Sequence, residues 1–325
     1  MPRYKLILWA VLSMPLSCSL AFAASEPWPA EPIRLVIAYS PGGSTDVAGR
    51  LLAKRLSETM GQQVVVENRP GAGGTIGAAY VARSKPDGYT LLMAASPEVS
   101  IAPVTMKQMP YDPLKDLAPI SLVGKMPFLL LVNPDLPVET LADLIAYAKA
   151  NPDKLNYSSF GNNTSNHLVG EQFKMATGIR ATHVPYKGSG PSIADLIGGR
   201  VQYTFDSATA PLAQVQAGKL RALAVTTSER LENAPSIPTM AEAGLPGFLA
   251  GSWYGLLAPA GTPQPIIDRL NAETRAALNS AELKKSFSTS NIVPAPGSPG
   301  EFRDYIESEI VKWRSLAAQV GIEAQ

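Results

Sequence analysis

The chain contains few of the residues on which metal and catalytic sites depend. It has two histidines in 325 residues, and its one cysteine, Cys18, lies in an apolar segment near the N-terminus. Because cysteine and histidine are the usual zinc ligands, this composition argues strongly against a His/Cys metal site. Neither a Gly-x-x-x-x-Gly-Lys-Ser/Thr phosphate loop nor a Gly-x-Ser-x-Gly nucleophile elbow occurs in the sequence. We therefore expect no metal, no catalytic residues and a protein that is not an enzyme.

The sequence also lacks an excess of charge of either sign. The 28 basic and 27 acidic residues leave a net charge of +1 at pH 7. Nucleic-acid binding depends on clustered Lys and Arg, so this balance predicts no nucleic-acid partner. The segment Gly71–Gly77 mimics a dinucleotide-binding fingerprint, but Ile76 occupies the position of the third glycine. We therefore expect no cofactor.

The N-terminus has the pattern of an export signal. Arg3 and Lys5 form a short basic region, Leu6–Leu12 is apolar, and Ala21-Phe22-Ala23 fits the rule for signal-peptide cleavage. The apolar run is too short to span a membrane. We expect residues 1–23 to be a cleaved signal peptide and the mature protein to be periplasmic.

Cleavage after Ala23 removes two basic residues, so the net charge changes from +1 to −1, and no cysteine remains. The alternative is lipidation of Cys18, because Pro-Leu-Ser-Cys18 weakly resembles a lipoprotein site. A mature chain of roughly 300 residues usually forms two domains.

Strand and helix signals alternate along the mature chain. This order favours parallel sheets with helices on both faces. The predicted strands are residues 33–39, 64–67, 90–95, 129–132, 154–159, 183–186, 201–205, 222–226 and 253–257. The predicted helices begin at residue 44 or span residues 75–84, 138–150, 166–177, 191–197, 266–279, 281–288 and 299–319.

The turn after the first predicted strand is the most informative segment. The apolar run Ile33–Tyr39 is broken by Pro41-Gly42-Gly43, and Ser44 then offers an N-cap for a helix. The first turn of a helix has unpaired N–H groups and a partial positive charge. Two glycines also let a ligand approach the backbone closely. The segment is therefore either an anion-binding loop or an ordinary strand-to-helix turn.

A second segment of the same kind lies in Asn156–His167. It combines a strand, a polar loop with a glycine and the start of a helix. Hydroxyl and amide groups at a helix N-terminus cap the helix or bind an anion. Because ligands of open α/β sheets sit beyond the carboxyl ends of the strands, the two loops are expected to face each other across a cleft.

Long motifs accompany these loops in a fixed order. Together they resemble the Bug-type extracytoplasmic solute receptors of tripartite tricarboxylate transporters, over essentially the whole mature chain. The motifs are Trp28-Pro-x-x-Pro-Ile-Arg34, Pro41-Gly-Gly-Ser-x-Asp46, Glu67-Asn-Arg-Pro-Gly-Ala-Gly-Gly74, Lys85-Pro-Asp-Gly-Tyr-Thr-Leu91, Pro110-Tyr-Asp-Pro-Leu-Lys-Asp116, Asn156-Tyr-x-Ser159, His183-Val-Pro-Tyr-Lys-Gly188, Pro238-Thr-Met-Ala-Glu-Ala-Gly-Leu-Pro-Gly247 and Trp253-Tyr-Gly-Leu-Leu-Ala-Pro-Ala-Gly-Thr-Pro263.

The resemblance implies an α/β protein with the two-domain type II periplasmic binding protein fold and a ligand cleft between its domains. The first domain is discontinuous, residues 28–122 and 252–325, and the second is residues 123–251. Chain crossings near Val123-Gly124 and Gly251-Ser252 form the hinge. In such receptors two facing loops hold a small carboxylate through backbone amides and hydroxyl groups.

The resemblance also assigns the binding residues by motif. Asp206 matches the family position that meets the distal end of the ligand. Neither loop contains an arginine clamp, which fits neutral donors aimed at an anion. The first loop (residues 39–46) supplies Tyr39, Ser40, Gly42, Gly43, Ser44 and Asp46; the second loop (residues 158–165) supplies Ser158, Ser159, Asn163, Thr164 and Ser165.

The sequence departs from the family pattern at two positions where specificity is expected. Ser96-Pro97-Glu98 follows the third strand, where the family usually has small or uncharged polar residues. If Glu98 faces the cleft, it repels a second carboxylate or pairs with a ligand amino group; the alternative is that it points to solvent. Phe160 either stacks on an aromatic acid or narrows the pocket. His167 and His183 are expected to be structural.

The function that follows is capture of a small organic carboxylate, aliphatic or aromatic, by domain closure. The ligand favours the closed state through its differential affinity. The expected partners are the membrane subunits of a tripartite tricarboxylate transporter, and the receptor is expected to be a monomer. One alternative is a ligand sensor that signals to a membrane kinase. The other is a secreted enzyme, against which the missing catalytic and metal sets argue.

Overall fold

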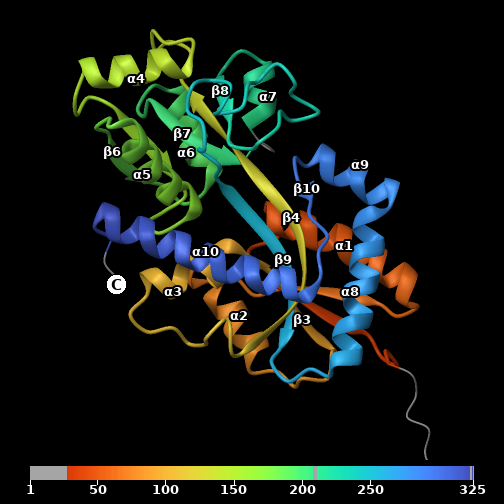
Figure 1. Cartoon of the computed structure of the whole chain (residues 1–325). Helices are drawn as coiled ribbons and strands as arrows, with labels where there is room; N and C mark the ends of the chain where they lie inside the picture. The colour runs from red at the N-terminus through yellow and green to blue at the C-terminus, as the bar shows by residue number, and fades with distance from the viewer. Residues whose placement is uncertain (1–27, 208–210, 323, 325) are drawn as a thin grey trace, which may run out of the picture.

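A computed structural model of the chain describes residues 28–207, 211–322 and 324. The predicted signal peptide, residues 1–23, and Cys18 within it lie outside this described part. The described chain forms two halves, which lie one above the other in Figure 1 and are joined by two long strands.

The first half is built on three parallel strands, β1 (Ile33–Ile37), β2 (Val64–Asn68) and β3 (Thr90–Ala95). β1 lies between the other two. Leu35 and Ile37 pack in one apolar cluster and Val36 and Ala38 in another. Helix α1 (Ser44–Met60) contributes to the first cluster and α2 (Thr75–Ala82) to the second. Helices on both faces bury every residue of β1 except Arg34, which explains its nearly continuous apolar sequence.

The second half repeats this arrangement. β5 (Asn156–Ser159) pairs in parallel with β6 (Thr182–Pro185) and β7 (Tyr203–Ser207). The ring of Phe173 packs edge-on against Tyr203 and Phe205 and fixes its helix on the sheet. The remaining elements of this half are α4 (Leu141–Ala150), α5 (Ser165–Thr177), α6 (Ser189–Ile197), α7 (Pro211–Gln216) and β8 (Arg221–Val225).

Two strands connect the halves. β4 (Leu117–Val132) leaves the first half and β9 (Gly251–Pro259) returns to it, so the two pair antiparallel. β9 also pairs antiparallel with β3, and the far end of β4 pairs antiparallel with β7 and β8. The strand order is β2-β1-β3-β9-β4-β7-β5-β6. The prediction of parallel sheets is therefore wrong at the centre, because strands that leave and return must run in opposite directions.

The C-terminal part of the chain packs around this frame. It comprises α8 (Gln264–Asn279), α9 (Ala281–Thr289), β10 (Val293–Pro294) and α10 (Pro299–Val320). Short helical segments also follow β2 and β3, namely η1 (Ala72–Gly74), η2 (Pro97–Ile101) and α3 (Ala102–Thr105). Within the described residues, each helix is too short or too polar to cross a bilayer.

Helix α10 spans both halves. Ser298 and Glu301 form a capping box at its start, and a left-handed Gly321 ends it. Phe302, Ile306, Ile310 and Trp313 are buried, as their helical spacing predicts. The helix contacts β4 and η2 and also α5 of the second half, so its packing extends beyond the first domain.

Candidate functional site

The first loop presents an open helix N-terminus. Gly43 is the N-cap of α1, and no side chain forms a capping hydrogen bond there. Ser40, Gly42 and Gly43 are exposed, and Ser44 is half-buried. Gly42 has a φ of 84°, a left-handed conformation that glycine adopts readily. The amides of the first turn are thus available to an anion.

The Asp46 carboxylate stabilises this loop through three hydrogen bonds. Its Oδ2 accepts from the Gly42 amide and from Arg50 Nε, both at 2.9 Å, and its Oδ1 accepts from Asn68 Nδ2 at 2.8 Å. Burial raises the pKa of the Asp46 carboxyl, but hydrogen bonds from Arg50, Gly42 and Asn68 outweigh burial and leave it below its usual value. Asp46 therefore stays ionised, and both of its oxygens already accept hydrogen bonds from the protein.

The second loop is folded on itself. Ser159 Oγ lies 3.0 Å from the Gly161 carbonyl and 3.1 Å from the Gly161 amide. Thr164 Oγ1 donates to the same carbonyl at 2.8 Å and caps α5 by accepting from the His167 amide at 3.4 Å. Asn163 has a left-handed φ of 61°. These bonds fix the backbone of the loop that leads into α5.

The two histidines hold the second loop in this shape. His183 Nε2 lies 2.6 Å from Ser159 Oγ, and His167 Nδ1 accepts from the Asn163 amide at 3.1 Å. The imidazole rings stack with centroids 4.0 Å apart. Burial lowers the pKa of both, that of His183 to about 4, where the neighbouring His167 contributes as well. Both rings are therefore neutral at pH 7.

The Ser159–His183 contact does not form a catalytic dyad. The Ser159 side chain is fully buried and its hydroxyl is bonded within its own loop. In the described chain no carboxylate hydrogen-bonds to His183 to orient the ring as a general base. The pair lacks the exposed nucleophile and the third group that such catalysis requires. Among the described residues no cluster of His, Cys, Asp or Glu could hold a metal ion.

Three serine hydroxyls join the two halves between the loops. Ser96 Oγ, at the end of β3, lies 3.1 Å from Ser165 Oγ and 3.0 Å from Ser252 Oγ. All three side chains are buried. Ser165 is the first residue of α5 and Ser252 lies in β9, so one cluster contains both halves and a connecting strand. In the described chain no hydrogen bond joins the first loop directly to the second. Ser252 was predicted as part of the hinge and not as a residue of the site.

Glu98 points inward. It is fully buried, so the alternative that it points to solvent is wrong. Its Oε2 accepts from the Tyr39 hydroxyl at 2.5 Å and its Oε1 from the Ala95 amide at 2.6 Å. Burial raises the pKa of Glu98 to about 7. Glu98 thus connects the end of β3 with Tyr39, the first residue of the first loop.

The remaining predicted residues lie in the second loop or beside it. Asp206 is fully buried, accepts from Ser189 Oγ at 2.6 Å, and has its pKa raised by burial to about 7. Ser158 is buried and accepts from Ser192 Oγ at 2.8 Å. Phe160 is half-buried. Ser189 and Ser192 were missed because their approach from α6 is a tertiary contact without a local sequence signal.

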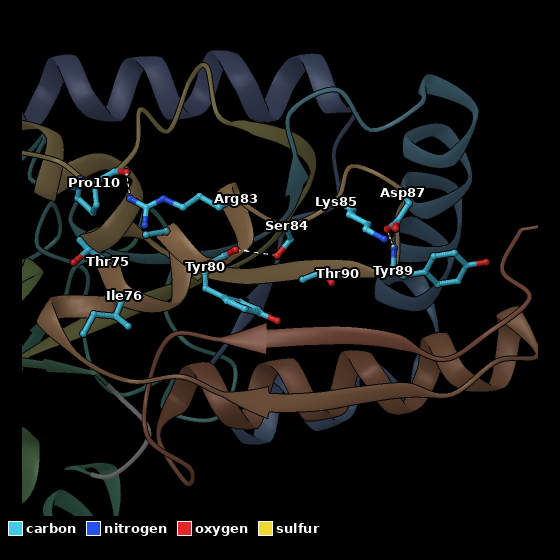
Figure 2. A pocket seen from close by; sticks show the side chains of 11 residues that line it. Thr75, Ile76, Tyr80, Arg83, Ser84, Lys85, Asp87, Tyr89, Thr90 and Pro110 are labelled. Atoms are coloured by element: carbon cyan, nitrogen blue, oxygen red, sulfur yellow. Dashed lines mark hydrogen bonds between the residues drawn. The ribbon is translucent and has the colours of Figure 1, made fainter.

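A separate surface groove of about 730 Å³ lies along α2 (Figure 2). Its lining includes Tyr80, Arg83 and Lys85, but Arg83 Nη2 already donates to the Pro110 carbonyl at 3.0 Å. The groove is open and contains no residue of either loop. We assign the candidate site to the loops, because buried polar groups from both halves converge there.

Two α/β halves that are joined by two strands and share a buried serine cluster are typical of a solute-binding receptor. The chain matches the model of the tripartite tricarboxylate transporter family receptor over residues 48–322. It is 40% identical over 299 residues to Protein BugT of Bordetella pertussis, with 92% of each chain covered. The chain belongs to this receptor family, which confirms the resemblance. The family comprises solute receptors, so the chain is a receptor and not an enzyme.

Solved structures agree with this assignment. Rpa4515 of R. palustris, solved with adipate, matches with a TM-score of 0.84 and 39% identity, covering 92% of this chain and 100% of that one. MatC from Rhodopseudomonas palustris, solved with bound malate, matches with a TM-score of 0.77 and 32% identity, covering 89% and 99%. The predicted fold class is thereby confirmed.

Proposed function

We propose that this receptor captures a small organic carboxylate between the first and second loops and closes around it. The observation that carries this proposal is the uncapped N-terminus of α1 at Gly43, which lies on the same edge of the sheet as Ser96 and its contact with Ser165 at the start of α5. Backbone amides at helix N-termini favour an anionic group. The adipate and malate bound by two relatives support a carboxylate as the ligand.

The closing motion is proposed to occur in the connecting strands. In this proposal residues 28–122 and 252–325 form one domain and residues 123–251 the other. β4 and β9 pair where Gly124 lies opposite Tyr254 and Pro127 opposite Gly251. Bending of the two strands between these pairs would change the distance between the loops. A ligand that contacts both loops only in the closed form then shifts the population toward closure.

Delivery to a membrane transporter is the favoured outcome of capture, and signalling to a membrane kinase is the alternative. Both need export, which we propose occurs with cleavage after Ala23. N-terminal sequencing of the secreted protein is then expected to begin at Ala24, whereas a lipid on Cys18 would contradict cleavage there.

Carboxylate binding is tested by unfolding the protein in sodium adipate, malate or benzoate. An acid at 100 times its dissociation constant is expected to raise the free energy of unfolding by about 2.7 kcal/mol. The neutral amide of the acid that binds is the matched control, and it is expected to stabilise far less because the loop amides lose a charged acceptor. Equal stabilisation by acid and amide would contradict the proposal.

A further inference from the structure

The carboxylate of Glu98 is buried without a compensating cation. The titratable groups that interact with it in the described chain are the phenols of Tyr39, Tyr111 and Tyr254, all uncharged because burial raises their pKa values. The neighbouring elements β3, η1 and α3 contain no ionisable residue. On α10, the buried Glu309 pairs with Lys312 instead.

Glu98 holds three segments of the first half together. Its oxygens accept from Tyr39 at the start of the first loop and from the amide of Ala95 at the end of β3. A Cβ on Gly74, in η1, would lie 3.0 Å from its carboxyl carbon. The Tyr111 hydroxyl donates to the Glu98 carbonyl at 2.5 Å and fixes the backbone. Movement of this carboxyl group would therefore move Tyr39.

The hydrogen bonds around Glu98 accommodate both of its protonation states. The Tyr39 hydroxyl lies 2.5 Å from Glu98 Oε2 and 3.3 Å from the Gly73 carbonyl. When Glu98 is ionised, Tyr39 donates to it. When Glu98 is protonated, it donates to Tyr39 Oη, and the Tyr39 hydroxyl turns to the Gly73 carbonyl. Burial brings the pKa of Glu98 to about 7, so both states are populated near neutral pH.

We propose that Glu98 is the positioning residue of the first loop and takes up a proton when an organic anion binds. This inference rests on the proposed function, because the anion must sit at the first loop. An anion at the uncapped N-terminus of α1 raises the cost of a second negative charge near Tyr39. Binding then favours the protonated form, and affinity falls as the pH rises through the range in which free Glu98 ionises.

Titration calorimetry of the full mature protein tests the proposal. Adipate, malate and benzoate are titrated at pH 6.5, 7.5 and 8.5, where carboxylic acids of this kind are ionised. Repeating each titration in buffers with different ionisation heats gives the number of protons taken up. We expect uptake of a fraction of a proton per ligand at pH 7.5 and at least a threefold loss of affinity from pH 6.5 to 8.5.

Matched variants identify the group that takes up the proton. Glu98→Gln keeps the shape: its oxygen can accept from the Ala95 amide while its NH2 group donates to Tyr39 Oη, as protonated Glu98 does. It is expected to abolish the uptake and flatten the pH dependence. Glu309→Gln removes another buried glutamate and is expected to leave the uptake unchanged. Uptake that persists in Glu98→Gln and is lost in Asp206→Asn would assign the proton to Asp206 and overturn the proposal.

The same titrations separate the role of Glu98 from the binding of a carboxylate. An acid that binds without proton uptake leaves the function intact and overturns the role of Glu98. If none of the three acids binds, the proposed function fails, and this inference with it. Without ligand, the wild type should lose stability relative to Glu98→Gln from pH 5 to pH 8, since its native carboxyl holds a proton more tightly than the unfolded chain does. A constant difference would overturn the titration of Glu98.

Discussion

Glu98 and Asp206 are both fully buried, and in the described chain neither has a cation beside it. Burying an unpaired carboxylate is costly, and burial raises the pKa of each to about 7. Asp206 accepts from Ser189, whereas Glu98 accepts from Tyr39 and a backbone amide. Both acids are therefore held by neutral donors, the same kind of group that the loops offer to a ligand.

At the scale of single residues, the first prediction concerns the start of α5. The double substitution Thr164→Ala and Ser165→Ala should weaken carboxylate binding by roughly 1.5–3 kcal/mol for each charged hydrogen bond lost. The free energy of unfolding should fall by about 1 kcal/mol for the lost Thr164 cap and by about 1 kcal/mol more for the lost hydrogen bond between Ser165 and Ser96. Calorimetry with the acid that binds and urea unfolding measure the two effects.

Thr140→Ala is the matched control for this substitution. Thr140 caps α4 by accepting from the Asp143 amide at 3.1 Å, and neither residue belongs to the candidate site. Thr140→Ala should lower the free energy of unfolding by about 1 kcal/mol for its lost cap and leave affinity unchanged. If the double variant loses stability but binds normally, Thr164 and Ser165 have a structural role only.

At the scale of an element, the second loop depends on two neutral imidazoles. His167 Nδ1 must be unprotonated to accept from the Asn163 amide. Burial and the nearby His167 lower the pKa of His183 to about 4, against 6.5 for a free imidazole. The unfolded chain thus binds the proton more readily than the folded protein. The contribution of neutral His183 to the free energy of unfolding is therefore complete above pH 6.5 and is lost as the pH falls toward 4.

This linkage gives the second prediction. His183→Gln keeps a polar group beside Ser159 but removes the titration, so its free energy of unfolding should fall less between pH 6.5 and 4.5 than that of the wild type. Urea unfolding at pH 6.5, 5.5 and 4.5 provides the comparison. Parallel pH profiles for the two proteins would show that His183 is not the group responsible.

Most helices and short strands follow from local sequence, but the central strand does not. Residues 129–132 were predicted as a strand, whereas β4 begins at Leu117. Pro119, Gly124 and Pro127 indicate breaks locally. In the structure the register with β9 shifts between Pro119 and Ser121 and between Leu122 and Gly124, so irregular pairing accommodates Pro119 and Gly124, while Pro127 pairs with Gly251 in regular register. Pairing with β9, far along the chain, stabilises a strand that its own sequence disfavours.

The candidate site was predictable to the same extent. The positions of both loops follow from strand, glycine and helix signals in sequence, and the structure forms both turns there. The contact of Tyr39 with Glu98 joins residues 59 apart, and that of Ser96 with Ser252 joins residues 156 apart. Neither contact has a local signal, because each depends on how β3, β9 and α5 pack. The direction of the Glu98 side chain was undecidable from sequence for this reason.

For the molecule as a whole, the proposed mechanism makes the serine cluster a contact that a closed arrangement has and an open one lacks. Ser96 belongs to the first half, Ser165 to the second and Ser252 to β9. A hydrogen bond between two halves stabilises closure only while the halves meet. In the proposed mechanism its free energy therefore adds to the affinity for a ligand held between the loops.

The third prediction follows from this contact. Ser96→Ala should destabilise the closed form by about 1 kcal/mol, which corresponds to roughly fivefold weaker binding. Ser100→Ala is the control, because the Ser100 hydroxyl is buried in η2 with no hydrogen-bond partner among the described residues. Calorimetry and small-angle scattering of both variants would contradict the prediction if Ser96→Ala bound and closed like Ser100→Ala.

Helix α10 contacts β4 and η2 in one half and α5 in the other. In the proposed mechanism a bound acid leaves only after the halves separate, and separation requires α10 to give up its contacts with one of them. The residence time of the ligand therefore depends on the packing of this helix as well as on the loops that bind the acid. Substitutions where α10 meets α5 can change the dissociation rate while every hydrogen bond to the ligand stays the same.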